Sequence, residues 1–329
     1  MQKGCAMNGE PKMEVSSLRS LRSDVLTLLG IFPKRVPLRP RVEATIDERG
    51  YARARVTYRV EAGERVPAWL LMPHGAVPAG GWPALLAVHQ HAGQYDLGKA
   101  EPAGLAGDPM YHYGHELAQR GYVVLCPDLL CFEERRLATQ GRAARRRLPG
   151  AEHERFEFTT RLLTGSCLQT KYLHDLRCAV DLLASLPSVN RERLGVIGHS
   201  LGGLQALWLA WYDARIRTAV SSCGFGLVRT LVRDGINHGF ATYVPGLLDV
   251  GDLDLVAAAV APRAFLLTAG EHDPLFPIDG VRAVVAAAQQ QYAAAGVPER
   301  FEAILFPSGH SFPDAVKAHA YAFVDRWLT

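Results

Sequence analysis

The sequence has little net charge, no long apolar run and no C-x-x-C pair of cysteines. Its 329 residues carry a formal charge of +3 at pH 7, which is too close to neutral to indicate a nucleic-acid partner. No segment contains the roughly 18 consecutive apolar residues that a membrane-spanning helix requires. The N-terminal stretch MQKGCAMNGEPKM has no apolar signal-peptide core. We therefore expect a cytoplasmic protein with neither nucleic-acid nor membrane partners.

The six cysteines form no C-x-x-C pair, and several lie in apolar segments, where cysteine behaves as a small hydrophobic residue. We expect reduced thiols, as in a cytosolic protein. The densest basic run, Arg135 to Arg147, contains no interleaved aromatic residue, so we expect a solvated surface there. The cysteines are Cys5, Cys126, Cys131, Cys167, Cys178 and Cys223.

Apolar runs of strand length alternate with helical patterns through most of the chain. Residues 16–29 predict an amphipathic helix, and residues 52–60 and 66–72 predict two antiparallel strands. The later alternation is typical of an α/β protein with a doubly wound, mostly parallel sheet that is covered on both faces. We expect the later strands at 84–90, 121–128, 193–198, 216–223, 263–270 and 301–307, and the later helices at 109–120, 168–187, 201–213, 279–295 and 313–328.

This organisation predicts an N-terminal helical extension, residues 1–50, packed on a main α/β domain, residues 51–329. Two segments, residues 129–166 and 224–258, are longer than ordinary connections between elements. Long insertions frequently form lids or binding loops. We therefore expect both insertions to shape a pocket.

A serine stands between two glycines in the stretch Gly198-His199-Ser200-Leu201-Gly202. It follows an apolar run and precedes a helical pattern, which places it at the carboxyl end of a strand, where open α/β sheets bind ligands. A sharp strand-to-helix turn crowds the positions two before and two after the serine, and glycine fits there best. The motif alone also allows a purely structural turn.

A serine nucleophile needs a histidine base and an orienting carboxylate, in the chain order Ser, Asp or Glu, His. Asp273 follows the strand at 263–270, and His310 follows the last strand. Both residues therefore lie at strand ends, as Ser200 does. We predict that Ser200, Asp273 and His310 are the catalytic residues.

Four residues compete for the roles of acid and base. Glu271 is a second acid at the same strand end, whereas Asp279 is more typical of a helix cap. His272 lies directly beside the acid candidate, and His319 falls inside the terminal helix. These positions favour Asp273 and His310 without excluding Glu271.

The oxyanion of a tetrahedral intermediate needs two backbone N–H donors. We expect one from Leu201, directly after the serine. The second is expected from the loop after the strand at 84–90, at His91 or, next in order, Gln90.

The histidines around this loop raise the alternative of a metal site completed by Asp96. An H-x-H at a strand end, however, points its two rings to opposite faces. No cysteine pair or H-E-x-x-H motif accompanies it, so we predict neither a metal nor a cofactor. The histidines are His89, His91, His112 and His115.

Three motifs resemble the α/β-hydrolase superfamily: GHSLGG at 198–203, EHDPLF at 271–276 and GHSFP at 309–313. The loop HQHAG and the strand GYVVLCPD are similar to the dienelactone hydrolase and acetyl xylan esterase branches. The resemblance covers about residues 60–329 and implies an α/β-hydrolase fold and cofactor-free ester hydrolysis through an acyl-enzyme. This chain departs from dienelactone hydrolases proper, which have a cysteine nucleophile at the position of Ser200. The first loop also lacks the H-G-G-G run of some lipases.

The leading functional prediction is a serine hydrolase of carboxylic esters with a short to medium acyl group, acting on a small-molecule substrate. A peptidase, thioesterase, acyltransferase or carbon–carbon hydrolase would use the same three residues, and a non-catalytic binding scaffold is a further alternative. The sequence leaves a homo-oligomer open. The expected apolar lining of the pocket comes from Phe225, Phe240, Tyr243 and Phe276, with Gly224 and Val244 beside them.

Overall fold

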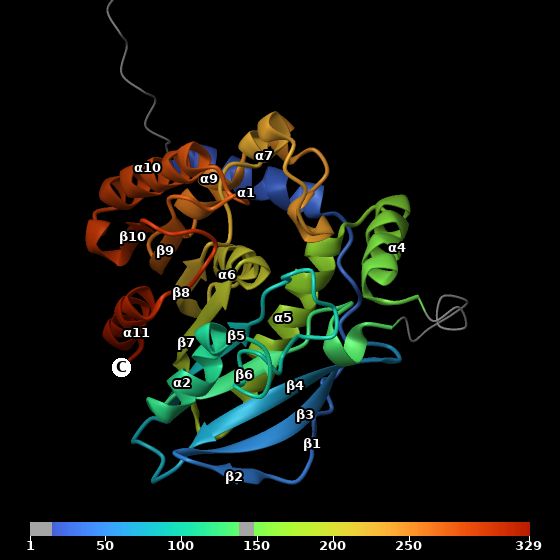
Figure 1. The fold of residues 1–329 in the computed structure, drawn as a ribbon, viewed down its shortest axis with the longest axis vertical. Coiled ribbons are helices and arrows are strands. Elements are labelled where there is room, and N and C mark those ends of the chain that lie inside the picture. Colours follow the sequence, from blue (N-terminus) through green and yellow to red (C-terminus); the bar gives the residue numbers. More distant parts are fainter. Residues whose placement is uncertain (1–14, 138–147) are drawn as a thin grey trace, which may run out of the picture.

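The computed structural model describes residues 15–137 and 148–329 (Figure 1). Its centre is one ten-stranded sheet in the order β1-β3-β4-β6-β5-β7-β8-β9-β10, with β2 paired to β3. The strands are β1 (Arg41–Val42), β2 (Ile46–Glu48), β3 (Tyr51–Glu61), β4 (Glu64–Pro73), β5 (Trp82–Val88), β6 (Val123–Pro127), β7 (Val189–His199), β8 (Ile216–Ser222), β9 (Ala264–Gly270) and β10 (Phe301–Phe306).

The sheet is parallel over its larger part and antiparallel at its N-terminal end. β5 pairs in parallel with β6 and β7, and β7 through β10 continue in parallel. β3 pairs antiparallel with β4, and β4 pairs antiparallel with β6. The predicted doubly wound, mostly parallel sheet with antiparallel N-terminal strands is confirmed. Since β5, β7, β8, β9 and β10 run in one direction, their carboxyl ends meet at one edge of the sheet.

Helices cover both faces of the sheet. Two of them, α2 and α11, pack on one face through a buried cluster that includes Tyr113 and Phe323. On the other face, α5 and α6 belong to a second cluster with Leu173 and Leu207. The helices predicted outside the insertions are confirmed to within a few residues. They are α1 (Val15–Leu29), α2 (Tyr113–Gln119), α5 (Leu168–Ser185), α6 (Leu201–Tyr212), α10 (Ile278–Ala294) and α11 (Asp314–Leu328), with 3-10 turns at η1 (Pro109–Tyr111) and η4 (Pro298–Arg300).

Both insertions contain helices that the sequence did not predict. The first holds α4, which stands beside α5, and the second holds α7, on the outside of the molecule (Figure 1). The insertion elements are η2 (Glu133–Arg135), α4 (Gly150–Leu163), α7 (Val228–Asp234), η3 (Phe240–Thr242), α8 (Leu247–Val250) and α9 (Leu253–Ala258).

The N-terminal part of the described chain joins the body in two ways. α1 buries Leu21, Val25 and Leu29 in the same cluster as α5 and α6. β1 and β2 then extend the sheet by pairing with β3, so residues 41–48 belong to the sheet rather than to a separate helical layer. Among the described helices, none is both long enough and apolar enough to cross a membrane.

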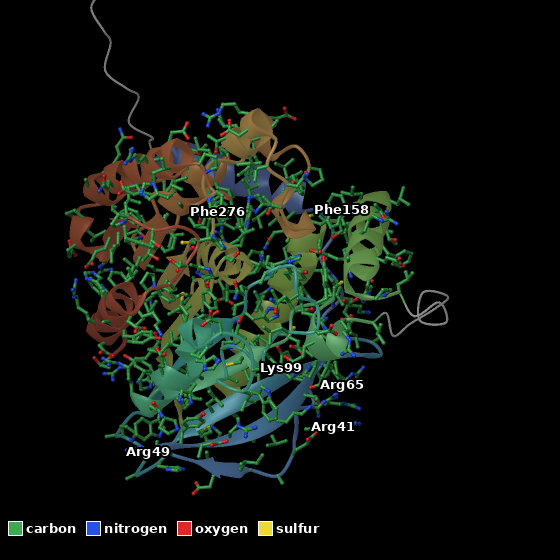
Figure 2. All side chains as sticks on the ribbon, in the orientation of Figure 1. Arg41, Arg49, Arg65, Lys99, Phe158 and Phe276 are labelled. Carbon is green, nitrogen blue, oxygen red and sulfur yellow. The ribbon has the colours of Figure 1, made fainter. Side chains whose placement is uncertain are left out.

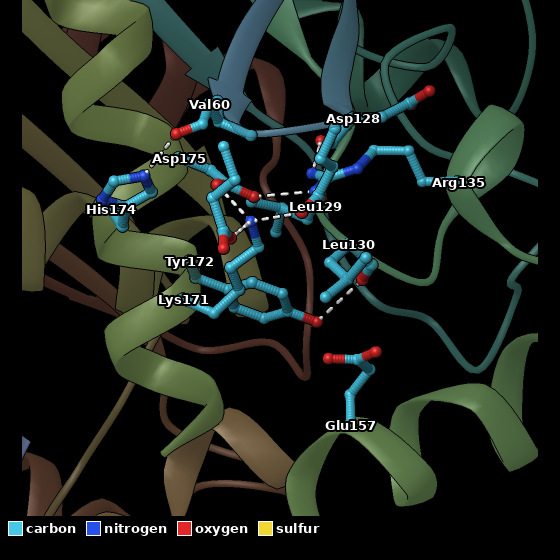
Figure 3. A network of polar contacts seen from close by, with 12 residues as sticks. Val60, Asp128, Leu129, Leu130, Arg135, Glu157, Lys171, Tyr172, His174 and Asp175 are labelled. Atoms are coloured by element: carbon cyan, nitrogen blue, oxygen red, sulfur yellow. Dashed lines mark hydrogen bonds and ion pairs between the residues drawn. The ribbon is translucent and has the colours of Figure 1, made fainter. Parts of the chain in front are cut away.

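The basic run begins with a buried arginine. Residues 138–147 of this run lie outside the described residues, but Arg135 is buried and donates to Oδ2 of Asp175 at 2.8 Å (Figure 3). It also donates to Glu64. The expectation of a solvated surface is therefore wrong for Arg135, because the two carboxylates bind its guanidinium inside the fold. Nζ of Lys171 lies 2.9 Å from Oε2 of Glu64 and 2.9 Å from Oδ1 of Asp175, so these four residues form one buried ion network.

Candidate active site

Ser200 lies at the turn between β7 and α6 and has a positive φ, with φ 53° and ψ −120°. Its N–H donates to the carbonyl of Ser222 on β8 at 2.8 Å, and its carbonyl accepts from the N–H of Leu204. Positive φ is strained for a residue with a Cβ. These backbone bonds hold the strained turn in place at the carboxyl edge of the sheet.

The two glycines of the motif are required by close approaches of the backbone. A Cβ on Gly198 would lie 2.3 Å from the carbonyl of Gly202. A Cβ on Gly202 would lie 1.9 Å from the carbonyl oxygen of Val88, at the end of β5. Neither contact leaves room for a side chain, so the turn and the end of β5 can pack together only with glycine at both positions.

Asp273 and His310 meet beyond the ends of β9 and β10. Nδ1 of His310 lies 2.7 Å from Oδ2 of Asp273, whose side chain is 1% exposed. Oδ1 of Asp273 accepts from the N–H of Leu275 at 2.9 Å. Both carboxylate oxygens therefore have donors, and the histidine ring is oriented by one of them.

The loops that carry the two residues touch each other through backbone. The N–H of His272 donates to the carbonyl of Ser308 at 2.9 Å, and a Cβ on Gly270 would lie 2.1 Å from the carbonyl oxygen of Gly309. The acid and the histidine are thus brought together by the pairing of β9 with β10.

The competing acids and His319 are engaged elsewhere. Glu271 pairs with Arg282 at 2.9 Å, and Asp279 pairs with Arg233 on the surface. His319 lies 2.6 Å from Glu302 on the outer side of α11. The geometry therefore joins only Asp273, of these acids, to His310.

Ser200 and His310 line one cavity of about 340 Å³. A larger cavity of about 500 Å³ opens beside β3 and β4, but it contains neither residue and is lined by charged side chains such as Arg135. The smaller cavity is the candidate active site. Its lining consists of His91, Ala92, Gly93, Tyr95, Glu154, Ser200, Asn237, His238, Gly239, Phe240, Leu275 and His310.

The predicted oxyanion donors lie where the loop after β5 meets the start of α6. Leu201 is the first residue of α6, so its N–H has no carbonyl partner within the helix. The N–H of His91 makes no backbone hydrogen bond within residues 15–137 and 148–329. Gln90 is buried, its side chain donates to Glu101 at 3.1 Å, and it is absent from the cavity lining. Of the two loop candidates, His91 is the one on the cavity wall.

His199, the second residue of the motif, packs behind the predicted base. Its ring centroid lies 4.7 Å from that of His310 and 4.5 Å from that of Tyr111, and its Nδ1 bonds Oγ of Ser222. Complete burial lowers the pKa of His199 well below its ordinary value, so the ring stays neutral. Sequence reasoning missed this contact because the motif allows any residue at that position.

The predicted aromatic lining is brought only partly to the cavity. Phe240 lines the cavity and stacks on Phe158 of α4. The ring centroid of Phe276 lies 6.0 Å from that of His310, but Phe276 is not part of the cavity lining. Tyr243 lines a neighbouring cavity, and Phe225 is buried in the core against Phe265. Phe158 and Phe276 both lie in the half of the molecule away from β1 and β2 (Figure 2).

Both insertions contribute to the cavity with residues that the sequence did not identify. α4 supplies Glu154, and the loop before η3 supplies Asn237, His238 and Gly239. Nε2 of His238 lies 2.8 Å from the carbonyl of Leu275, and burial lowers the pKa of His238. The expected lid-like role of the insertions remains a proposal, but both reach the candidate site.

Cys223, Asp273 and His310 place ligand atoms within 4.8 Å of one another, which is a spacing suited to a metal ion. Asp273 and His310 already use those atoms on each other. Burial raises the pKa of Cys223 to about 12, so its sulfur remains a thiol, and a thiolate is the form that binds metals. The site therefore fits acid–base chemistry better than metal binding. The five cysteines within the described residues are buried and unpaired.

Comparison with known proteins places the chain in a family. The model of the dienelactone hydrolase family matches residues 100–328. The chain belongs to the dienelactone hydrolase family. This α/β-hydrolase is 31% identical over 314 residues to "Putative hydrolase YtaP" of Bacillus subtilis, covering 93% of this chain and 98% of that protein. The expected family resemblance is confirmed, and hydrolase is the level of function that these matches support.

Solved structures share the fold at low sequence identity. A glucuronoyl esterase from Solibacter usitatus superposes with a TM-score of 0.69 at 16% identity, covering 98% of this chain and 95% of that one. An acetyl xylan esterase from Paenibacillus sp. R4 superposes with a TM-score of 0.62 at 18% identity, covering 97% of each chain. At such identities the similarity shows the α/β-hydrolase fold alone.

Proposed function

We propose that this protein is a serine esterase that hydrolyses carboxylic esters with a short to medium acyl group. The observation that carries the proposal is the cavity shared by Ser200 and His310, in which Nδ1 of His310 is hydrogen-bonded to the buried Asp273. The strained strand-to-helix turn at Ser200 is the arrangement that exposes a nucleophile in α/β-hydrolases. Membership of the dienelactone hydrolase family supports the same class of reaction.

The proposed mechanism uses each residue in one role. Oγ of Ser200 attacks the ester carbonyl carbon while Nε2 of His310 accepts the hydroxyl proton, and Asp273 stabilises the imidazolium through Nδ1. The N–H groups of Leu201 and His91 stabilise the oxyanion. His310 then protonates the leaving alcohol, and a water molecule that the same ring deprotonates releases the acid and restores Ser200.

The size of the cavity supports the short to medium acyl preference. A volume of about 340 Å³ lies near the lower end of the range for small-molecule sites. Phe240 and Leu275 provide apolar surface for an acyl or alcohol chain. The reaction as proposed needs water and these side chains and no cofactor.

The direct test compares wild type with Ser200→Ala on p-nitrophenyl esters from acetate to palmitate. Loss of the nucleophile should lower kcat by roughly 10⁶-fold, because residues of a triad act as a unit. Ser20→Ala, at an exposed serine on α1, is the matched control and should retain wild-type turnover. A fluorophosphonate should label wild type and not Ser200→Ala.

Two results would contradict the proposal. One is ester hydrolysis that survives Ser200→Ala at the wild-type rate. The other is a wild-type protein that neither hydrolyses the esters nor reacts with the fluorophosphonate. A kcat/KM that rises from acetate through palmitate would leave the nucleophile in place and refute the short to medium acyl preference.

A further inference from the structure

A carboxylate outside the predicted triad lies in the wall of the same cavity. Glu154 on α4 is 1% exposed and lines the cavity together with Ser200 and His310. Its Oε2 accepts from the hydroxyl of Tyr95 at 2.6 Å and lies 3.1 Å from Nε2 of His91. Its Oε1 is buried and has no hydrogen-bond partner among the described residues.

The charge on Glu154 is not balanced by a strong cation nearby. In residues 15–137 and 148–329, its one ion-pair partner is His91. Nδ1 of His91 accepts the N–H of Gly93 at 3.0 Å, so the ring donates to Glu154 through Nε2, as a neutral imidazole does. A buried carboxylate oxygen without a donor is unfavourable, and in a ligand cavity a ligand can supply the missing donor.

Packing fixes the carboxylate in this position. A Cβ on Gly150, at the start of α4, would lie 2.1 Å from Tyr95, so α4 contacts the 91–95 loop without a gap. The backbone of the second insertion also approaches this carboxylate, since a Cβ on Gly239 would lie 2.9 Å from His91 and 3.6 Å from Oε1 of Glu154. The contact with His91 leaves no room for a Cβ, so glycine is what lets this backbone approach His91 and the unpaired oxygen of Glu154.

We propose that Oε1 of Glu154 binds a hydroxyl group of the substrate, so that the enzyme selects esters with a free hydroxyl near the scissile bond. This inference rests on the proposed esterase function. An unpaired carboxylate oxygen accepts hydrogen bonds only, so its ligand must be a donor. The carboxylate also disfavours an ester that carries a negative charge at this position.

A hydroxyl fits the cavity better than an ammonium group. His310 becomes positively charged when it accepts the proton of Ser200, and a fixed cation in the same cavity would oppose that charge. A neutral hydroxyl has no such effect. It can also accept a hydrogen bond from the exposed amide of Asn237, which lines the same cavity, whereas an ammonium group can only donate.

The test measures kcat/KM for two matched ester pairs. Propyl acetate and glycerol monoacetate differ by hydroxyls on the alcohol side, and methyl butanoate and methyl 3-hydroxybutanoate differ by one on the acyl side. The hydroxylated member of at least one pair should be preferred by roughly 10- to 100-fold, the range for a hydrogen bond to a charged group. Monomethyl succinate and acetylcholine provide the anionic and cationic comparisons.

Glu154→Gln is the variant that isolates Oε1. The amide oxygen can still accept from Tyr95 and His91, while the NH₂ group replaces the unpaired acceptor by a donor. The hydroxyl preference should fall by about fivefold to tenfold in this variant, because the NH₂ group offers the hydroxyl only a neutral hydrogen bond, and the change should appear mainly as a higher KM for the hydroxylated ester. Glu152→Gln, at an exposed position on the same helix, is the matched control and should keep the preference.

Each other outcome overturns the inference. Wild type with no preference in either pair refutes it without any variant, as does a preference for acetylcholine or monomethyl succinate over the hydroxylated esters. An equal loss for both members of a pair in Glu154→Gln would mean that Glu154 only positions the His91 loop. If the hydroxyl preference is absent but Ser200 reacts with a fluorophosphonate and plain esters are hydrolysed, only the role of Glu154 is refuted. If Ser200 does not react and plain esters are not hydrolysed, the proposed esterase function is refuted as well.

Discussion

At the scale of single residues, the candidate site combines one strained residue with one tightly held pair. Ser200 keeps a positive φ, which costs on the order of 1–3 kcal/mol for a residue with a Cβ. The backbone bond from Ser200 to Ser222 and the two motif glycines hold this conformation. Asp273 holds His310 through one oxygen and the N–H of Leu275 through the other. The strained turn positions Ser200, and the hydrogen bond with Asp273 orients His310, in the cavity that these two side chains share.

Replacing Asp273 with Asn should lower kcat by roughly 10³- to 10⁴-fold. The amide can present an N–H to Nδ1 of His310, which would put the ring proton on Nε2 and remove the acceptor that Ser200 needs. The measurement is steady-state turnover of p-nitrophenyl acetate.

Asp279→Asn is the control for this change, because Asp279 is an exposed aspartate a few residues away that pairs with Arg233. Its turnover should match wild type. A loss of less than tenfold in Asp273→Asn would show that another group orients His310.

At the scale of elements, the loop after β5 is held by a buried histidine. Nδ1 of His89 bonds the carbonyl of Gln90 at 2.7 Å, and its Nε2 accepts the N–H of Leu129 at 3.1 Å. Only a neutral ring can make both contacts. Since the loop continues to His91, this clamp supports the expected oxyanion donor.

The two hydrogen bonds of the His89 ring predict that the stability of the protein falls at acid pH. Burial lowers the pKa of His89 from its ordinary 6.5 to about 4. Because the folded pKa lies below the unfolded one, the stabilisation is complete above pH 6.5 and is lost as the pH falls toward 4. Wild type should lose up to roughly 3 kcal/mol of unfolding free energy over this window.

The measurement is denaturant unfolding at several pH values, on wild type and His89→Gln. The Gln side chain can accept a hydrogen bond from the Leu129 N–H and does not titrate. The free energy of unfolding of His89→Gln should therefore depend less on pH between 6.5 and 4 than that of wild type. The same pH slope in both proteins would contradict the role assigned to His89.

At the scale of the whole molecule, a buried ion network joins the antiparallel hairpin to the helical layer. Lys171 on α5 has a fully buried side chain and contacts Asp175 on its own helix (Figure 3). It also contacts Glu64 at the start of β4. Burial raises the pKa of Glu64, but Arg135 and Lys171 outweigh it and lower that pKa to about 2. The Glu64 carboxylate therefore stays charged in the folded protein near neutral pH.

Lys171→Met should lower the free energy of unfolding by about 3–5 kcal/mol, since it leaves buried carboxylates short of a cation. Urea unfolding followed by tryptophan fluorescence measures the effect. Arg217→Ala is the control, because the Arg217–Glu192 pair is exposed and worth at most about 1 kcal/mol. Equal losses in the two variants would mean that the network contributes no more than a surface pair.

Local patterns in the sequence were enough to predict the sheet, the helices on its faces and three residues at strand ends. Apolar periodicity identifies a strand or helix from neighbouring residues alone. The order of Ser200, Asp273 and His310 follows from the chain, and their spacing beyond β7, β9 and β10 follows from the parallel sheet.

The tertiary structure alone decided which residues of the insertions reach the cavity. α4 lies far from Tyr95 and His91 in the chain, and no local pattern pairs Glu154 with them. It also placed Arg135 inside the fold and Phe225 in the core rather than on the cavity. Periodicity reports which face of an element is apolar, whereas contacts between distant segments depend on how those faces pack. The candidate catalytic residues were therefore readable from the sequence, and the group that we expect to select the substrate was not.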